Sequence, residues 1–234
     1  MPDNPSESFR PLLALDASAT ASAAVVADGE ILAHWASTET NTHAEVLAPA
    51  VRRVLAEAQV EAGDVRAVLA GVGPGPFTGL RAGLVTARSL AFAWGIEVHG
   101  VMSLDAIALT AAEEAFRAGV EEFVVATDAR RREVYWAHYS QVGGQFQRLH
   151  GPFVTAPGEV TPLPAYGAGA GLYPDSLAAV QSFTHTVPDA GSLGLVGELA
   201  LRRGRGLMPV QPLYLRESDA KVPGPRKRAG TGQR

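Results

Sequence analysis

The 234-residue sequence contains no cysteine, and this absence excludes several kinds of chemistry. A chain without thiols forms no disulfide, no thiolate zinc site and no covalent intermediate on cysteine. The sequence also lacks any apolar run that approaches the roughly eighteen residues of a membrane-spanning helix. Its first residues, MPDNPSESFRP, do not place an apolar segment after a basic start, as a signal peptide would. We therefore expect a cytoplasmic protein that makes no use of a membrane.

Positive charge is unevenly distributed. The formal net charge is −4, but residues 219–234 carry five Lys/Arg and one Asp, so the rest of the chain carries a net charge of −8. An acidic body is a poor match for a phosphate backbone, and we expect no strong nucleic-acid binding by the chain alone. The basic tail has two interpretations: a solvated, disordered terminus, which is favoured, or a segment that touches RNA.

The first hundred residues alternate between the periodicities of strands and helices. Leu12–Asp16 is a continuous apolar run typical of a buried strand, and Asp28-Gly29 is a two-residue hairpin signal. The predicted elements are strands at Leu12–Asp16, Ala23–Ala27 and Glu30–Ser37, a helix at His43–Gln59, a strand at Val65–Val72, a helix at Phe77–Trp94 and a strand at Ile96–Val101. This β-β-β-α-β-α-β order predicts an α/β fold with a mixed sheet covered by helices.

The remaining residues predict a second, smaller α/β lobe. We expect helices at Leu104–Arg117 and Ser192–Arg203, and strands at Phe123–Thr127, Glu133–Tyr139 and QPLYLRES. Residues 145–174 are rich in proline and glycine, with only short strand-like pieces. The predicted organisation is an N-terminal tail at 1–10, a first lobe at 11–104, a second lobe at 105–218 and a basic disordered tail at 219–234.

The stretch GVGPGPFTGLRAG, residues 71–83, joins a strand to a helix and has two interpretations. Glycine-rich turns in this position can bind phosphate, but no Lys-Ser/Thr pair follows, and Pro74 and Pro76 remove two N–H donors. Alternatively the prolines stiffen the helix entry, and Thr78 caps the helix. Every fourth residue of the helix is then small, which favours close packing of another helix, from this chain or from a second protein; these residues are Gly79, Gly83, Ala87 and Ala91.

Five blocks of the sequence carry a specific resemblance. LDASATASAAV, THAEVLAPAV, GVGPGPFTGLRAGLVTARSLA, DARRREVYWAHY and YLRES occur in this order, and the resemblance that they carry runs from about Leu12 to Ser218. The chain resembles the bacterial TsaB (YeaZ) family of tRNA threonylcarbamoyladenosine biosynthesis proteins. The resemblance implies a two-lobed, actin-like ATPase fold of the ribonuclease H-like class, each lobe with a β-β-β-α-β-α-β core.

The resemblance also implies a function without catalysis by this chain. The expected role is that of a dimerisation and activating subunit for a TsaD-type catalytic subunit, which works together with a TsaE-type ATPase. That assembly transfers threonylcarbamoyl from threonylcarbamoyl-AMP to the adenosine beside the anticodon of tRNAs that read ANN codons, so the chain would meet tRNA only indirectly. The expected interface is a four-helix bundle in which helices 43–59 and 77–94 meet the same two helices of the catalytic subunit, and a homodimer through the same face is the alternative when the chain is alone. The interface residues expected are His43, Leu47, Val51, Val54, Gly79, Arg81, Gly83, Leu84 and Ala87.

The nucleotide and metal sites of the ATPase fold look vestigial in this sequence. The candidate positions are Asp16, Asp128, Gly167 and Gly169, and we expect no bound cofactor. His99 has no histidine four residues away, so no metal site is expected there. The alternative is a stand-alone nucleotide-dependent enzyme, a phosphotransferase, hydrolase or glycoprotease-like protein. For a protease, Ser18, Ser22 and Ser37 lie near His34 and His43 in sequence, but no GxSxG motif accompanies them.

Overall fold

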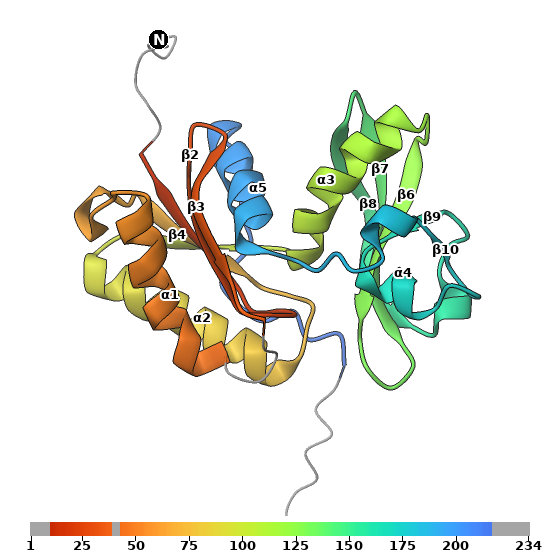
Figure 1. Cartoon of the computed structure of the whole chain (residues 1–234), viewed down its shortest axis with the longest axis horizontal. Helices are drawn as coiled ribbons and strands as arrows, with labels where there is room; N and C mark the ends of the chain where they lie inside the picture. Colours follow the sequence, from red (N-terminus) through yellow and green to blue (C-terminus); the bar gives the residue numbers. More distant parts are fainter. Residues whose placement is uncertain (1–9, 39–42, 217–234) are drawn as a thin grey trace, which may run out of the picture.

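The computed structural model describes residues 10–38 and 43–216, which form two five-stranded sheets with helices packed against them (Figure 1). The first sheet has the order β3-β2-β1-β4-β5, and the second β10-β9-β6-β7-β8. The first half comprises β1 Leu12–Asp16, β2 Ser22–Ala27, β3 Glu30–Ala36, α1 His43–Glu57, β4 Ala67–Gly71, α2 Phe77–Trp94 and β5 Glu97–Val101. The second comprises α3 Ser103–Arg117, β6 Glu122–Asp128, β7 Val134–Val142, β8 Gln145–Thr155, β9 Pro164–Tyr166, α4 Ala168–Leu172, β10 Ala178–Ala179 and α5 Ala190–Arg202.

The two sheets share one topology. In the first, β1 pairs antiparallel with β2 and parallel with β4; in the second, β6 pairs antiparallel with β7 and parallel with β9. Read from its other edge, the second sheet therefore repeats the first strand by strand. The β-β-β-α-β-α-β order predicted for the first half is confirmed, including the turn at Asp28-Gly29, where both residues have positive φ.

Helices α3 and α5 each pack on the sheet of the other half of the chain. α3 follows the first sheet but packs on β6, β7 and β8, whereas α5 follows the second sheet and packs on β1 and β2. Both helices lie between the sheets and contact each other (Figure 1). Residues 190–202 were expected in the second lobe, whereas α5 packs on the first sheet; an apolar helix face does not specify which sheet will cover it. The lobe boundary at residues 104–105 itself stays a prediction.

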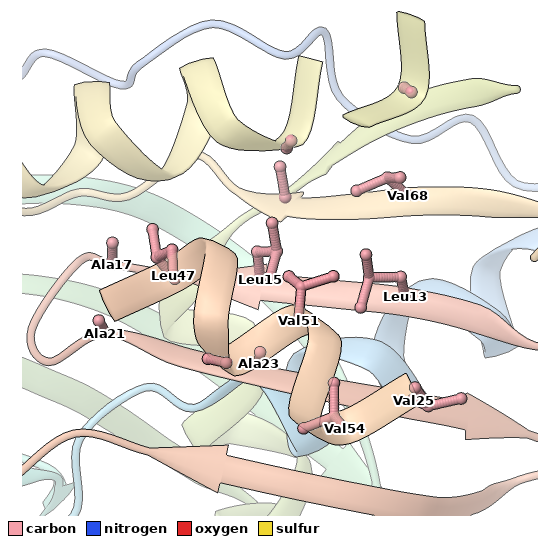
Figure 2. Close-up of a cluster of buried hydrophobic side chains, with 14 of the residues drawn as sticks. Leu13, Leu15, Ala17, Ala21, Ala23, Val25, Leu47, Val51, Val54 and Val68 are labelled. Carbon is pink, nitrogen blue, oxygen red and sulfur yellow. The ribbon is translucent and has the colours of Figure 1, made fainter. Parts of the chain in front are cut away.

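One core lies between the first sheet and the helix pair α1 and α2. Leu47, Val51 and Val54 recur along one face of α1 and point at the sheet, where they meet Leu15 and Val25 (Figure 2). These five side chains are at most 2% exposed. The spacing of three or four residues places the three residues of α1 on one face, which is why this stripe predicted a helix here; the helix ends at Glu57, two residues before the predicted end.

The ends of α2 follow from glycine and proline. The N-cap position is held by Pro76, with no side-chain capping bond, so the predicted cap by Thr78 is wrong: Thr78 lies inside the first turn. Gly95 ends the helix in the left-handed conformation with φ of 67°, which glycine adopts without steric cost. Within the described residues, no helix has both the length and the apolar character needed to cross a membrane.

The segment after α5 is a strap across both halves instead of the predicted strand QPLYLRES. Met208 forms an isolated bridge to Gly100, and the Leu213 N–H donates to the Val72 carbonyl at 2.8 Å. The guanidinium of Arg216 then reaches the second half and donates to the Ala129 carbonyl at 3.0 Å. No continuous ladder forms over residues 211–216, while residues 217 and 218, like the two predicted tails at 1–9 and 219–234, lie outside the described residues.

Candidate functional site

Two aspartates occupy matching positions in the two sheets. Asp16 ends β1 and faces Ser22 across the first hairpin; Asp128 ends β6 and faces Val134 across the corresponding hairpin. Each carboxylate accepts the N–H two residues further on, from Ser18 at 2.8 Å and from Arg130 at 2.7 Å. The structure therefore places both sequence-predicted carboxylates at equivalent strand ends, and their surroundings differ.

Asp16 is enclosed by hydroxyl groups of its own chain. Asp16 is only 1% exposed. Its carboxylate accepts hydrogen bonds from the Ser18 hydroxyl at 2.7 Å and from the Ser103 hydroxyl at 2.6 Å. Ser103 in turn accepts the Gly73 N–H at 3.1 Å, so the carboxylate, α3 and the glycine loop form one network. Burial raises the pKa of Asp16 above its ordinary value, while the hydrogen bonds from Ser103 and Ser18 oppose that rise.

The glycine loop packs directly against the turn that follows Asp16. A Cβ on Gly71 would lie 1.9 Å from Asp16 Oδ2, and one on Gly75 would lie 2.5 Å from the Ser18 carbonyl oxygen. Real Cβ atoms do not approach so closely, so both glycines are required for the loop to pack on the Asp16–Ser18 turn. This contact supports the packing interpretation of GVGPGPFTGLRAG over the phosphate-binding one.

The buried carboxyl of Asp16 predicts a pH-dependent stability difference. Its pKa is higher in the folded chain than in the unfolded chain, so its contribution to stability is complete below about pH 3.8 and is lost as the pH rises through the folded-state pKa. The Asp16→Asn chain does not titrate there. We expect the free energy of unfolding of Asp16→Asn minus that of the unchanged chain to increase as the pH rises from 4 to 7. Urea denaturation at each pH measures both values. Asp175→Asn, which removes an exposed carboxyl, is the control; a difference for Asp16→Asn that stays constant with pH would refute the prediction.

The second strand end is open where the first is closed. The Asp128 side chain is 28% exposed and pairs with the Arg130 guanidinium at 3.1 Å. Nearby, a Cβ on Gly167 would lie 2.5 Å from the Ala126 carbonyl oxygen, and one on Gly169 would lie 2.7 Å from the Thr127 nitrogen. Both glycines therefore allow α4 to pack against β6, and this packing accounts for them without a nucleotide.

Ser18, Ser22 and His34, three of the groups considered for a protease, bind within the chain. The Ser22 hydroxyl accepts the Ala190 N–H at 3.0 Å, while Ser18 bonds to Asp16 as described above. His34 Nε2 lies 3.4 Å from an Asp189 carboxylate oxygen, an arrangement that ties β3 to the start of α5. His99, excluded above as a metal ligand, bonds to Glu97 at 3.1 Å. These contacts are structural, and His43 is the first residue of α1.

Seven of the nine residues predicted for a partner interface are buried on the inner faces of α1 and α2. Leu47, Val51, Val54, Leu84 and Ala87 are at most 3% exposed, and Gly79 and Gly83 are buried too. Arg81 is exposed, but its Nε donates to the Tyr214 hydroxyl of the strap at 2.8 Å. The predicted stripe is therefore part of this chain's own core, because an apolar stripe does not reveal which partner covers it.

The outer face of α2 carries apolar side chains that the sequence analysis missed. Val85 is 61% exposed and Phe92 is 91% exposed, and their separation of seven residues places them two turns apart on one face. On the neighbouring helix α1, Ala48, Pro49 and Ala56 are also exposed. We call Val85, Phe92 and these three residues the outer helix face. The sequence does contain a sign of this face, because Val85 and Phe92 are large apolar residues that lie outside the small-residue stripe of the same helix.

Comparison with known proteins places the chain among relatives of one kind. A family model described as TsaD, tRNA N6-adenosine threonylcarbamoyltransferase, matches residues 30–198. An uncharacterized protein from Mycobacterium tuberculosis is 39% identical over 216 residues, which cover 90% of this chain and 93% of that protein. The tRNA threonylcarbamoyladenosine biosynthesis protein TsaB from Escherichia coli is 29% identical over 237 residues, 91% of this chain and 98% of that protein.

Solved structures agree with this placement. YeaZ from Pseudomonas aeruginosa has a TM-score of 0.74 and 32% sequence identity to this chain, over 88% of this chain and 100% of that chain. With the two mixed sheets and their flanking helices, this likeness confirms the predicted fold class, a two-lobed α/β fold of the actin-like ATPase type.

Proposed function

The chain belongs to the TsaB (YeaZ) family, and we propose that it acts in tRNA threonylcarbamoyladenosine biosynthesis as a non-catalytic subunit that pairs with a TsaD-type catalytic subunit. In this role it supports transfer of threonylcarbamoyl from threonylcarbamoyl-AMP to the adenosine beside the anticodon of tRNAs that read ANN codons. A TsaE-type ATPase is the third member of the proposed assembly.

The enclosed state of Asp16 is the observation that carries the non-catalytic assignment. A carboxylate that served a nucleotide or its metal ion would have to turn toward the ligand. Here it is held by three hydrogen bonds from Ser18 and Ser103, and Gly71 packs directly on it. Freeing it would leave buried hydroxyl and amide groups without partners, which costs about 1–3 kcal/mol for each group.

The outer helix face supports a protein partner. Phe92 and Val85 present apolar surface to solvent, and the neighbouring helix α1 also exposes small residues, which let a second pair of helices approach closely. This placement keeps the four-helix arrangement expected from the sequence, but it uses the opposite faces of the same two helices. A second copy of this chain is the alternative occupant of that face when the chain is alone.

Reconstitution of the transfer reaction tests the proposal. We expect the purified chain alone to show neither tight Mg-ATP binding nor ATP hydrolysis, and we expect its addition to a TsaD-type subunit with the TsaE-type ATPase to increase the modification of unmodified tRNA. Turnover of ATP by the isolated chain, or equal tRNA modification with and without it, would favour the stand-alone enzyme instead.

A further inference from the structure

A cavity of about 420 Å³ lies between the two halves of the molecule, and neither Asp16 nor Asp128 lines it. Its walls come from α3, α5, the start of β8 and residues 205–208 of the strap. Helices α3 and α5 lie between the two sheets and contact each other (Figure 1). The volume falls within the range of about 300–1,000 Å³ that small-molecule sites occupy, and such sites are frequent where two domains meet. We call it the α3–α5 cavity.

Apolar side chains from both halves line the α3–α5 cavity and remain partly exposed. Phe146 of β8 packs against two cores, one between α3 and the second sheet and one between α5 and the first sheet. Leu199 of α5 is 37% exposed. The partly exposed apolar residues of the lining are Leu109, Phe146, Leu199, Leu207 and Met208. A ligand that covered them would remove apolar surface from water, which favours binding.

One pair of opposite charges in the cavity is balanced within the chain. The Tyr139 hydroxyl donates to Asp105 Oδ1 at 2.9 Å, and Arg148 Nη1 lies 3.9 Å from the same oxygen and contacts the Met102 sulfur. Burial raises the pKa of Asp105 above its ordinary value, while the charge of Arg148 and the hydrogen bond from Tyr139 oppose that rise. Asp105 and Arg148 together therefore add no net charge to the lining.

The other charged side chains of the lining leave an excess of positive charge. They are Glu113, Arg203 and Arg205, and all three are exposed. Arg203 donates to an uncharged acceptor, the Gln145 amide oxygen, at 3.1 Å. Within residues 10–38 and 43–216, the Arg205 side chain has no hydrogen-bonded or ionic partner. With three arginines and two carboxylates the lining has a net charge of +1, in a chain whose formal net charge is −4.

We propose that the α3–α5 cavity binds a small organic anion, with an aromatic or aliphatic body against Phe146 and Leu199 and one anionic group at Arg203 and Arg205. Guanidinium groups form paired, charge-assisted hydrogen bonds with carboxylate, sulfonate or phosphate oxygens, and one excess positive charge matches a ligand with one negative charge. Because the lining comes from both halves, the bound anion would contact α3 and α5 together. The site is independent of the proposed function.

The test uses two dyes that differ by one anionic group. The first probe is 8-anilinonaphthalene-1-sulfonate, whose fluorescence rises when it leaves water, titrated into the full chain. N-phenyl-1-naphthylamine has the same rings without the sulfonate and measures the apolar contribution alone. Arg203→Gln with Arg205→Gln removes the two cations of the site. Arg52→Gln with Arg53→Gln removes the same charge from exposed positions on α1, which carries part of the outer helix face, and is the matched control.

We expect the unchanged chain to bind the sulfonate saturably near 0.15 M salt. The Arg203 and Arg205 double variant should bind the sulfonate at least about tenfold more weakly, because it loses charged hydrogen bonds, and should bind the uncharged dye with unchanged affinity. The control pair should leave the affinities of both dyes unchanged. Ala200→Phe places an aromatic ring in the cavity lining and should weaken binding of both dyes.

Three results would overturn the inference. They are a lack of saturable sulfonate binding by the unchanged chain, full sulfonate affinity in the Arg203 and Arg205 double variant, and equal weakening by the control pair. The last result would assign the dye to the outer helix face or to net charge. The melting temperature of each variant without dye checks its folding. Since Arg203 and Arg205 are exposed, their double variant decides the question even if Ala200→Phe does not fold.

Discussion

Replacing Gly83 by leucine is expected to lower the melting temperature of the isolated chain by about 2–12 °C, with no partner present. A Cβ on Gly83 would lie 3.1 Å from the Ala17 Cβ, already closer than most such contacts, and leucine adds three more carbons in the same direction. Overpacking of this kind costs about 1–3 kcal/mol, and each kcal/mol shifts the melting temperature of a chain this size by about 2–4 °C.

Two companion variants separate packing from helix propensity. Gly83→Ala adds only the Cβ and gains up to about 1 kcal/mol of helix propensity, so its effect should be much smaller than that of leucine. Val85→Leu enlarges an exposed residue two positions away and should leave the melting temperature unchanged. If Gly83→Leu had the same melting temperature as the unchanged chain, the close contact between α2 and the Ala17 turn would not be required for stability.

The sequence predicted α2 from Phe77 to Trp94, and these are the ends that the structure has. It did so because both ends have local causes: proline favours the first turn, and glycine at 95 accepts the left-handed conformation. The placement of α5 was not predictable in this way. Its apolar face fits either sheet, and the choice depends on contacts with β1 and β2, which lie more than 160 residues away in sequence.

The candidate site shows the same division between local and distant causes. Asp16 and Asp128 could be found from sequence because each ends an apolar strand and is followed by a turn. The closure of the site could not, since Ser103 bonds to Asp16 across 87 residues and Gly71 packs on it from a neighbouring parallel strand. The apolar period of α1 and α2 indicates which face of each helix is buried in this chain, but it does not indicate where a partner would bind.

Placing aspartates on the outer helix face, at Val85 and Phe92 together, is expected to weaken binding of the TsaD-type subunit at least thirtyfold. Both side chains are mostly exposed in the isolated chain, and a partner that covered them would exclude water from them. Loss of a buried aromatic anchor at an interface commonly costs 2 kcal/mol or more, which corresponds to about thirtyfold in affinity, and burying two unpaired carboxylates adds to that cost. The measurement is a titration of the purified subunits by calorimetry.

The chain supplies its own matched control for this pair. Phe116 and Val142 lie in the other half of the molecule and are 55% and 83% exposed, so Phe116→Asp with Val142→Asp adds the same charge at two other exposed apolar residues. Both double variants should have melting temperatures close to that of the unchanged chain, since neither pair belongs to a core. Only the variant with both changes on α2 should lose binding of the partner. Equal loss of binding by both would attribute the effect to net charge. Full affinity in the α2 variant would exclude the outer helix face as the contact surface and would leave the exposure of Phe92 to be explained by another partner, with a second copy of this chain the first to test by sedimentation.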